Sequence, residues 1–355
     1  MKKIAFLSSV IFLLTFSGCI KPPIVNPPDD GYRHGIFVVN EGAMGNSNGS
    51  VSHFDPDSLK ITNYLFNQAN GRPLGDVVQS MTISGNQGFI VVNNSQKVEV
   101  VDLKDFSSIG TIDGLTYPRH LLVIDSTKGY LSDGNFEGFV HVIDLQTFTI
   151  MSSIPCGKGP ERIVQYGDNI MVANSGGFDN DSTITVIDTS KDQLVTTWPT
   201  GYNPVDMVFD AQNRLWVMCK GKTIWNADWT LGVETESEII IHDPTTGAIL
   251  ERITIGMVGD YYWPNRIGSN PLGTRIYFIE AAGIMEIDLT RTGTDPTLLI
   301  PGSFYGFGVN PADGHIITLV CPSFTTSGLM VRYSPQGGEI DSYEVGIGPN
   351  GVAFN

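Results

Sequence analysis

The sequence predicts an all-β fold, a seven-bladed β-propeller with four-stranded blades, and three observations support this class. An apolar run closed by an aspartate recurs along the chain, as in VHVID at Asp144 and ITVID at Asp188. The repeat length lies in the forties, which is typical of one four-stranded blade. Gly, Asn, Asp and Pro recur at hairpin spacing, while helical patterning is nearly absent after residue 20.

Seven copies of this repeated anchor indicate seven blades. The anchors end at Asp55, Asp102, Asp144, Asp188, Asp243, Asp288 and, in a degenerate copy, Tyr333. Successive anchors are 47, 42, 44, 55, 45 and 45 residues apart. A blade packs only against its two neighbours, so a chain of 355 residues can remain one domain. Each anchor aspartate is expected to cap the turn that follows it.

The first residues of the chain predict export. Two lysines precede an apolar run over residues 4–16, which is too short to span a bilayer permanently. The following Ser17-Gly18-Cys19 resembles the lipobox of bacterial lipoproteins. This resemblance implies a signal peptide over residues 1–18, lipidation of Cys19 and a lipid-anchored protein of the outer membrane; an ordinary secretory signal is the alternative.

A proline-rich tether is expected to separate the lipid anchor from the propeller. Four prolines fall within residues 19–33, so this segment cannot pair in a sheet and should be extended. The propeller is then expected over residues 34–355.

The stretch from Phe139 to Trp198 defines the strands of one repeat. Strands are expected near residues 162–166, 169–174, 183–188 and 193–198. Gly167-Asp168-Asn169 is expected to join the first two as a tight hairpin.

The two ends of the propeller complement each other. Residues 36–40 align with the second strand of a blade and have no innermost strand before them, while residues 348–354 align with an innermost strand and have nothing after it. We expect the C-terminal strand to complete the first blade and close the ring, which removes the exposed edges of an open propeller.

Charge and cysteine content exclude some classes of function. The net charge is -16, from 21 Lys and Arg against 37 Asp and Glu, so no nucleic-acid partner is expected. Besides Cys19, the chain has Cys156, Cys219 and Cys321, an odd number whose spacing matches no zinc motif. We expect these three to be buried free thiols.

The turns before the innermost strands and the loops after the second strands should meet on one face, near the ring axis. Convergent polar groups over a concave floor are typical of a binding site. The turns contribute Gln79, Arg119, His120, Glu161, Arg162, Asn265, Arg266, Tyr305 and Asn350. The loops contribute Asn40, Asn93, Asp133, Asn174 and Glu280. An alternative role for the Arg and Glu residues is to pair with each other and hold adjacent blades together.

An aromatic rim is expected around this polar floor. Two loops are enlarged, over residues 41–50 and 220–238, and the second explains the 55-residue spacing. The candidate rim residues of the second loop and of other blades are Trp225, Trp229, Phe178, Trp263 and Tyr305. Aromatic rings bury a large flat area at small entropic cost, which suits a large flat ligand rich in amide or hydroxyl groups.

Three catalytic signals are weak. Residues 45–49 match G-x-S-x-G, but a nucleophile elbow requires a strand-to-helix turn. Residues 179–182 begin like a calcium loop and lack its later Gly and Glu, which leaves an irregular calcium site open. A divalent-metal site, as in lactone-hydrolysing propellers, would use Glu161, Asp206, Asn265 and Asn350. Neighbouring arginines oppose a cation there, so neither an enzyme nor a metal site is expected.

The repeated pattern of Pro-x-x-apolar, strand, Asn and a strand ending in V-x-V-I-D resembles the YncE-like seven-bladed propellers. With its lipoprotein signal and tether, the chain is similar to surface lipoproteins of Bacteroidetes of the BtuG type. This resemblance implies non-catalytic, high-affinity binding of cobalamin, a corrinoid, and its delivery to a TonB-dependent outer-membrane transporter. The alternatives are an interaction scaffold or adhesin for a protein or glycan, and a metal-dependent hydrolase.

Overall fold

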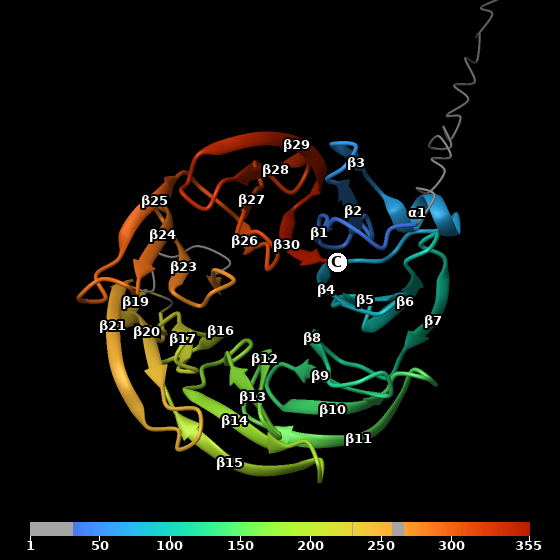
Figure 1. The fold of residues 1–355 in the computed structure, drawn as a ribbon. Helices are drawn as coiled ribbons and strands as arrows, with labels where there is room; N and C mark the ends of the chain where they lie inside the picture. Colours follow the sequence, from blue (N-terminus) through green and yellow to red (C-terminus); the bar gives the residue numbers. More distant parts are fainter. Residues whose placement is uncertain (1–30, 229, 258–265) are drawn as a thin grey trace, which may run out of the picture.

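Short β-branched runs separated by turn residues pair into seven four-stranded antiparallel sheets arranged as a ring (Figure 1). The computed structural model describes residues 31–228, 230–257 and 266–355. The predicted all-β, seven-bladed propeller is confirmed. The predicted signal peptide, the lipidation site Cys19 and most of the tether lie outside the described residues.

The first four blades, numbered along the chain, have the following strands. Blade 1 contains β1 (Ile36–Asn40), β2 (Ser50–Asp55), β3 (Lys60–Thr62) and β30 (Pro349–Phe354). Blade 2 contains β4 (Val78–Ser84), β5 (Gln87–Val92), β6 (Lys97–Asp102) and β7 (Ser108–Ile112). Blade 3 contains β8 (Pro118–Val123), β9 (Lys128–Gly134), β10 (Gly138–Asp144) and β11 (Thr149–Cys156). Blade 4 contains β12 (Pro160–Tyr166), β13 (Asn169–Asn174), β14 (Thr183–Asp188) and β15 (Gln193–Pro199).

The remaining three blades repeat the same order. Blade 5 contains β16 (Pro204–Phe209), β17 (Leu215–Cys219), β20 (Glu236–His242) and β21 (Ile249–Met257). Blade 6 contains β22 (Ile267–Ser269), β23 (Arg275–Glu280), β24 (Gly283–Asp288) and β25 (Thr297–Pro301). Blade 7 contains β26 (Gly306–Val309), β27 (Ile316–Val320), β28 (Ser327–Tyr333) and β29 (Glu339–Ile347). The strands predicted for blade 4 are confirmed, except that the first strand begins two residues earlier and the last strand ends one residue later.

The C-terminal strand closes the ring as predicted. Strand β30 pairs antiparallel with β1, and Val352 lies opposite Val38. In Figure 1 the red C-terminal strand lies beside the blue first strand. Blade 7 passes so close to β30 that a Cβ at Gly306 would lie 2.3 Å from the backbone oxygen of Asn350. Only glycine permits this approach.

Hydrophobic clusters between neighbouring blades supply the core. One cluster joins Val38 and Phe54 of blade 1 to Leu319 and Met330 of blade 7. Each of these four side chains is fully buried. Closure of the ring therefore removes the apolar faces of both terminal blades from water.

The anchor aspartates cap their turns, as predicted. The Asp144 carboxylate accepts hydrogen bonds from the backbone N–H groups of Gln146 and Thr147, at 2.8 and 2.9 Å. Asp188 and Asp243 cap the corresponding turns of blades 4 and 5 in the same way. The recurring aspartate is therefore a structural signature of the blade.

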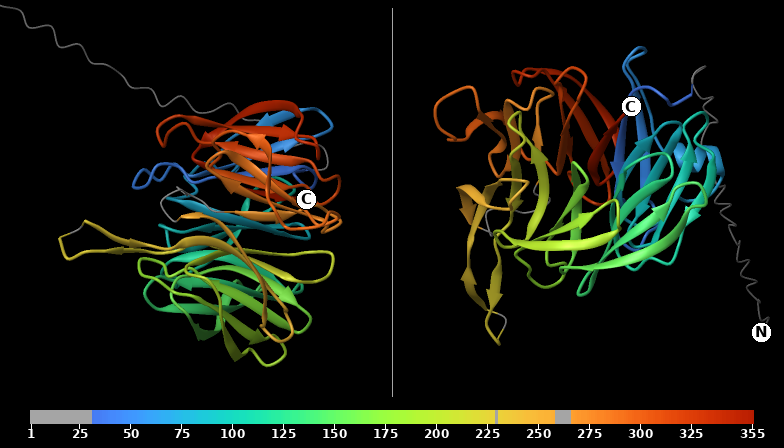
Figure 2. Two further views of the ribbon diagram at one scale, coloured as in Figure 1. Left: turned by 90° about the vertical axis from the view of Figure 1, so that its left-hand side faces the viewer. Right: turned by 60° about the horizontal axis from the view of Figure 1, so that its bottom comes forward.

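Two insertions interrupt the repeat. A short helix, α1 (Leu65–Asn70), follows β3 and buries Leu65 and Phe66. The enlarged loop predicted over residues 220–238 contains a separate two-stranded hairpin, β18 (Thr223–Trp225) with β19 (Leu231–Glu234). Figure 2 shows this arm projecting from one face of the ring, the face that also bears the loop after β1.

The three cysteines are free thiols, as predicted. Cys219 is buried, and burial raises its pKa to about 12, so it stays protonated. Cys156 and Cys321 are only partly buried. Across the described ranges, none of the helices has the length and apolar character that a membrane span requires.

Candidate functional site

Several innermost strands carry a β-bulge at the end where they begin. The pairing of β4 with β5 shifts register between Val78 and Ser80, and β12 with β13 shifts between Pro160 and Ile163. The same shift occurs at the start of β8 and of β16. A bulge takes a residue out of the ladder and redirects its side chain. The polar residues within these bulges thereby come together around the axis of the ring.

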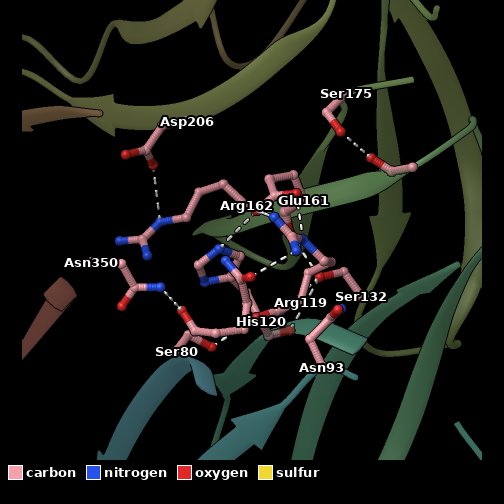
Figure 3. A network of polar contacts seen from close by, with 12 residues as sticks. Ser80, Asn93, Arg119, His120, Ser132, Glu161, Arg162, Ser175, Asp206 and Asn350 are labelled. Atoms are coloured by element: carbon pink, nitrogen blue, oxygen red, sulfur yellow. Dashed lines mark hydrogen bonds and ion pairs between the residues drawn. The ribbon is translucent and has the colours of Figure 1, made fainter. Parts of the chain in front are cut away.

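Arg119 is the central connection of this arrangement (Figure 3). Its Nε and Nη2 donate to the two carboxylate oxygens of Glu161, at 2.7 and 2.9 Å. Its Nη1 donates to Oε1 of Gln79 at 2.7 Å. Burial alone would raise the pKa of Glu161, but the Arg119 guanidinium holds this pKa well below its usual range. Arg119 therefore joins blades 2, 3 and 4 through a bidentate, charge-assisted contact.

His120 lies against the same carboxylate. Its Nε2 is 3.3 Å from Oε1 of Glu161, although this nitrogen is buried and makes no hydrogen bond of good geometry. Burial lowers the pKa of His120. The Glu161 carboxylate raises this pKa, whereas the positive charges of Arg162 and Arg266 lower it further. His120 is therefore a buried, neutral imidazole around pH 7.

Arg162 extends from the same turn as Glu161 into solvent. Its Nε lies 3.4 Å from Oδ1 of Asp206, and its side chain is 46% exposed. Asp206 is itself held by the backbone N–H groups of Met207 and Ile267, at 2.9 and 3.2 Å. Arg162 thus keeps N–H donors available to a ligand on this face of the ring. Its contact with Asp206 also connects blade 4 to blades 5 and 6.

The C-terminal strand completes the circle through Asn350. Its Nδ2 donates to Oε1 of Glu41 at 2.8 Å, and the Tyr305 hydroxyl donates to the other carboxylate oxygen at 2.9 Å. Burial raises the pKa of Glu41 in spite of these two donors. Nδ2 of Asn350 also lies 3.3 Å from the backbone oxygen of Gln79, so blades 7, 1 and 2 are linked.

These contacts form a nearly continuous chain around the axis, which we call the axial ring. Its members are Glu41, Gln79, Arg119, His120, Glu161, Arg162, Asp206, Tyr305 and Asn350. Two half-buried cations lie nearby: the charge of Arg119 acts on Lys220, and that of Arg266 acts on Glu41. The pairing role considered for Arg and Glu holds for Arg119 with Glu161. Sequence reasoning missed Glu41, whose position directly after the second-strand Asn40 was its only signal.

Four predicted site residues are buried and hydrogen-bonded within or between blades, and their role as ligand contacts stays a prediction. Asn40, Asn93, Asp133 and Asn174 are at most 3% exposed. Nδ2 of Asn93 donates to the backbone oxygen of Pro118 at 2.9 Å, and the Asp133 carboxylate accepts from the Thr116 N–H at 2.9 Å. Asn40 and Asn174 bond to hydroxyl groups of their own blades. At the ends of second strands, these side chains satisfy buried groups within and between blades.

Of four further predicted site residues, the structure describes one and leaves three outside its described ranges. Glu280 ends β23 on the same face of the ring and is half-buried. Trp229, Trp263 and Asn265 lie outside the described residues. The outcome for these three therefore stays a prediction.

The predicted aromatic rim is present in part. Phe178 is 67% exposed, and its ring contacts those of Tyr117 and Phe136, with centroids 5.6 and 6.1 Å apart. Trp225, on the β18–β19 arm, is 57% exposed. Tyr305 contacts Phe324 edge to face at 5.5 Å. Sequence reasoning missed Tyr117, although it directly precedes the turn into β8, and Phe136.

The carboxylates considered for a metal site face cations instead. Glu161 is bound by Arg119 and Asp206 by Arg162. Over residues 31–228, 230–257 and 266–355, no three His, Cys, Asp or Glu side chains are arranged to hold a metal ion. In the loop considered for calcium, Asp179 pairs with Lys158 and Asp181 accepts from the Lys158 N–H. These acids are thus engaged in the loop structure.

A shallow cavity lies away from the axial ring. It has a volume of ≈ 480 Å³ and is lined by the β4–β5 and β8–β9 turns, including Asn86 and Asp125. These turns are at the opposite ends of the strands from the bulges. The Asp125 carboxylate in it caps its own turn through the Thr127 and Lys128 N–H groups. The cavity therefore offers less convergent chemistry than the axial ring.

The fold and the axial ring define a seven-bladed β-propeller with a preorganised polar site on one face. The chain belongs to the family described as Domain of unknown function (DUF5074), which matches residues 34–345. No curated protein sequence matches this chain.

Solved structures with similar folds are distant in sequence. A quinonprotein alcohol dehydrogenase-like protein of Bacteroides thetaiotaomicron has a TM-score of 0.68 at 13% identity, covering 92% of this chain and 79% of that one. A functionally unknown protein of Desulfotomaculum acetoxidans has a TM-score of 0.64 at 13% identity, covering 90% and 98%. Hydrazine synthase of Kuenenia stuttgartiensis has a TM-score of 0.59 at 18% identity, covering 79% and 92%. At such identities, these likenesses show the fold alone.

Proposed function

We propose that this protein is a non-catalytic, surface-exposed lipoprotein that binds a corrinoid, cobalamin in the first place, at the axial ring and delivers it to a TonB-dependent outer-membrane transporter. The observation that carries the binding role is the half-exposed guanidinium of Arg162 above a rigid polar floor. The corrinoid comes from the resemblance to BtuG-type lipoproteins.

A preorganised floor favours binding because little conformational freedom is left to lose. Arg119 is fixed by Glu161 and Gln79, and it in turn fixes the neighbouring turn that carries Arg162. Ligand groups that meet already oriented donors bind at smaller entropic cost. A corrinoid has amide groups and a phosphate, which match guanidinium and carboxamide donors.

The protonation states of the axial ring support binding over catalysis. Glu161 is held ionised by Arg119, and a carboxylate with so low a pKa is a poor general base or acid near pH 7. Its oxygens are also occupied by the guanidinium, so they are not directed at a reacting atom. These groups serve better as a charged scaffold.

The test is co-elution of purified mature protein with cyanocobalamin in gel filtration, followed by the corrin absorbance. Co-elution at micromolar concentration is expected, and free elution of the corrinoid would overturn this function. The test variant is Arg162→Ala, and its matched control is Arg291→Ala. Arg291 is an exposed arginine of blade 6 that pairs only locally with Asp288. The first variant should lose affinity and the second should keep it.

The proposed anchoring has its own test. Cys19→Ala should abolish labelling by a radioactive fatty acid and release the protein from the outer membrane fraction. Unchanged labelling would contradict lipidation at Cys19, whereas corrinoid binding by the purified variant would be unaffected.

A second candidate function, an interaction scaffold or adhesin, is favoured by the β18–β19 arm. Ile224, Trp225, Leu231 and Val233 on this arm are each at least 45% exposed. Exposed apolar side chains in such number are typical of an interaction surface. Capture of the purified transporter by the wild-type chain, and not by a variant lacking residues 222–235, would show that this arm supplies a protein contact.

A further inference from the structure

Two exposed phenylalanines form a platform on the same face as the axial ring. Phe136, in the loop after β9, is 61% exposed, and Phe178, in the loop after β13, is 67% exposed. Their ring centroids are 6.1 Å apart and their planes are inclined by 56°, so a flat ring that stacks on one phenylalanine contacts the other at an angle. Contiguous exposed apolar side chains are typical of interaction surfaces and ligand-binding grooves. We call Phe136 and Phe178, with Tyr117 behind them, the aromatic platform.

The platform is built on interlocked backbone rather than on free loops. The Ser175 and Gly176 N–H groups donate to the backbone oxygens of Gly159 and Lys158, at 2.8 and 2.9 Å. Gly177 has a φ of 61°, and a Cβ there would lie 2.5 Å from Oδ1 of Asn135. The two loops are therefore in close contact, and this contact fixes the positions of the rings.

The platform is continuous with the axial ring. The Tyr117 ring contacts Phe178 with centroids 5.6 Å apart, and the guanidinium carbon of Arg119 lies 5.5 Å from the Tyr117 centroid. Arg119 in turn binds Glu161, the residue before Arg162. An apolar stacking surface thus adjoins a site that presents an exposed cation.

We infer that Phe136 and Phe178 are a stacking subsite for a flat conjugated ring, and that the ligand of this face carries such a ring together with an anionic group bound by Arg162. Rings stack on exposed aromatic side chains through their faces, and a phosphate or carboxylate complements a guanidinium. The inference rests on the proposed function, since it takes the ligand face to be the same. It narrows the ligand to molecules that combine both groups, of which corrinoids with a nucleotide are one class.

The experiment measures binding by equilibrium dialysis with four probes: cyanocobalamin, flavin mononucleotide, riboflavin and inorganic phosphate. The proteins are the wild type, Phe136→Ala/Phe178→Ala, Arg162→Ala and the control Leu194→Ala/Val195→Ala. The control removes two side chains, 50% and 55% exposed, from the outer strand β15. Thermal unfolding of each variant shows that the fold is kept.

The platform variant should bind cyanocobalamin or flavin mononucleotide at least about tenfold more weakly than the wild type, and the control variant should bind like the wild type. Riboflavin should bind more weakly than its phosphate ester, and Arg162→Ala should remove that difference. Cyanocobalamin binding that is unchanged in the platform variant would overturn this inference and leave the proposed function standing. A second outcome is that the wild type binds flavin mononucleotide, the platform variant does not, and no protein binds cyanocobalamin. This outcome would overturn the proposed corrinoid function and support the stacking subsite. Failure of the wild type to bind any ring-bearing probe would overturn both.

Discussion

Arg119 and Glu161 face each other across the boundary between blades 3 and 4, with two parallel contacts of 2.7 and 2.9 Å between guanidinium and carboxylate. Both side chains are largely buried, at 18% and 8% exposure. The pair joins consecutive repeats at the axis. It makes the floor of the site a part of the structural framework.

Replacing Arg119 by alanine should strongly destabilise the protein. The change leaves the Glu161 carboxylate buried without its main partner, which typically costs about 3–5 kcal/mol. The free energy of unfolding from urea titrations measures this cost. Lys191→Ala is the control, because Lys191 belongs to an exposed pair with Asp188 and its loss should have little effect. Equal midpoints for the two variants would contradict a structural role for the axial pair.

Acidification should destabilise the protein through the same residues. The pKa of Glu161 is lowered in the fold, so between its folded and unfolded values the unfolded state binds more protons. Its contribution is complete above about pH 5 and is lost as the pH falls toward the folded value. The pKa of His120 is also lowered by burial, which gives a loss of the same sign below about pH 6.5.

The measurement is the free energy of unfolding of the wild type and of Glu161→Gln at pH 7 and pH 4. The wild type should lose more stability than the variant between these two pH values, because the variant has no carboxylate to protonate. Equal losses of stability in the two proteins would show that other carboxyl groups account for the destabilisation at low pH.

Removal of the last strand should open the ring. A chain ending at Gly348 lacks β30, so β1 loses its partner and the apolar cluster between blades 1 and 7 becomes accessible. We expect loss of the cooperative thermal transition or a fall in Tm of more than about 10 °C. A chain that begins at Gly31 and keeps β30 should melt like the mature protein. A truncated chain with an unchanged Tm would refute closure by this strand.

Trp225→Ala should weaken ligand binding without affecting stability. The Trp225 side chain is 57% exposed, so its truncation should change the free energy of unfolding little. The lost aromatic area should lower the affinity for cyanocobalamin several-fold. Met151→Ala, 53% exposed on the outer strand β11, is the control. Titration of each variant with cyanocobalamin, followed by the corrin absorbance, gives the two affinities. Equal affinities for Trp225→Ala and Met151→Ala would exclude the arm from the site.

The fold was predictable because its signals are local and repeated. The turn-capping aspartates, such as Asp144 and Asp188, mark the same point in six of the seven blades, and a hairpin repeat of that period has one common architecture. The missing strand at one chain end and the surplus strand at the other predicted closure, which the pairing of Val38 with Val352 confirms.

The site was predictable only in outline. The Pro-initiated turns identified Arg119, Glu161 and Arg162 because ring topology must bring those turns to the axis. The same reasoning included Asn93 and Asp133, whose side chains are buried and hydrogen-bonded to the turn before β8, because residue type and position alone do not reveal the partners of a side chain. Bulges are set by pairing with the neighbouring strand, and that pairing is not encoded in a single residue.

The sequence by itself determined the all-β class, the number of blades, the closing strand and the polar character of the central turns, since each depends on a periodic pattern or a short motif. Only the tertiary structure decided that Arg119 pairs with Glu161 while Arg162 remains half-exposed. It also decided that the Phe136 and Phe178 rings contact each other on one face. These outcomes depend on contacts between segments more than forty residues apart, where small differences in backbone position decide which groups pair and which reach solvent.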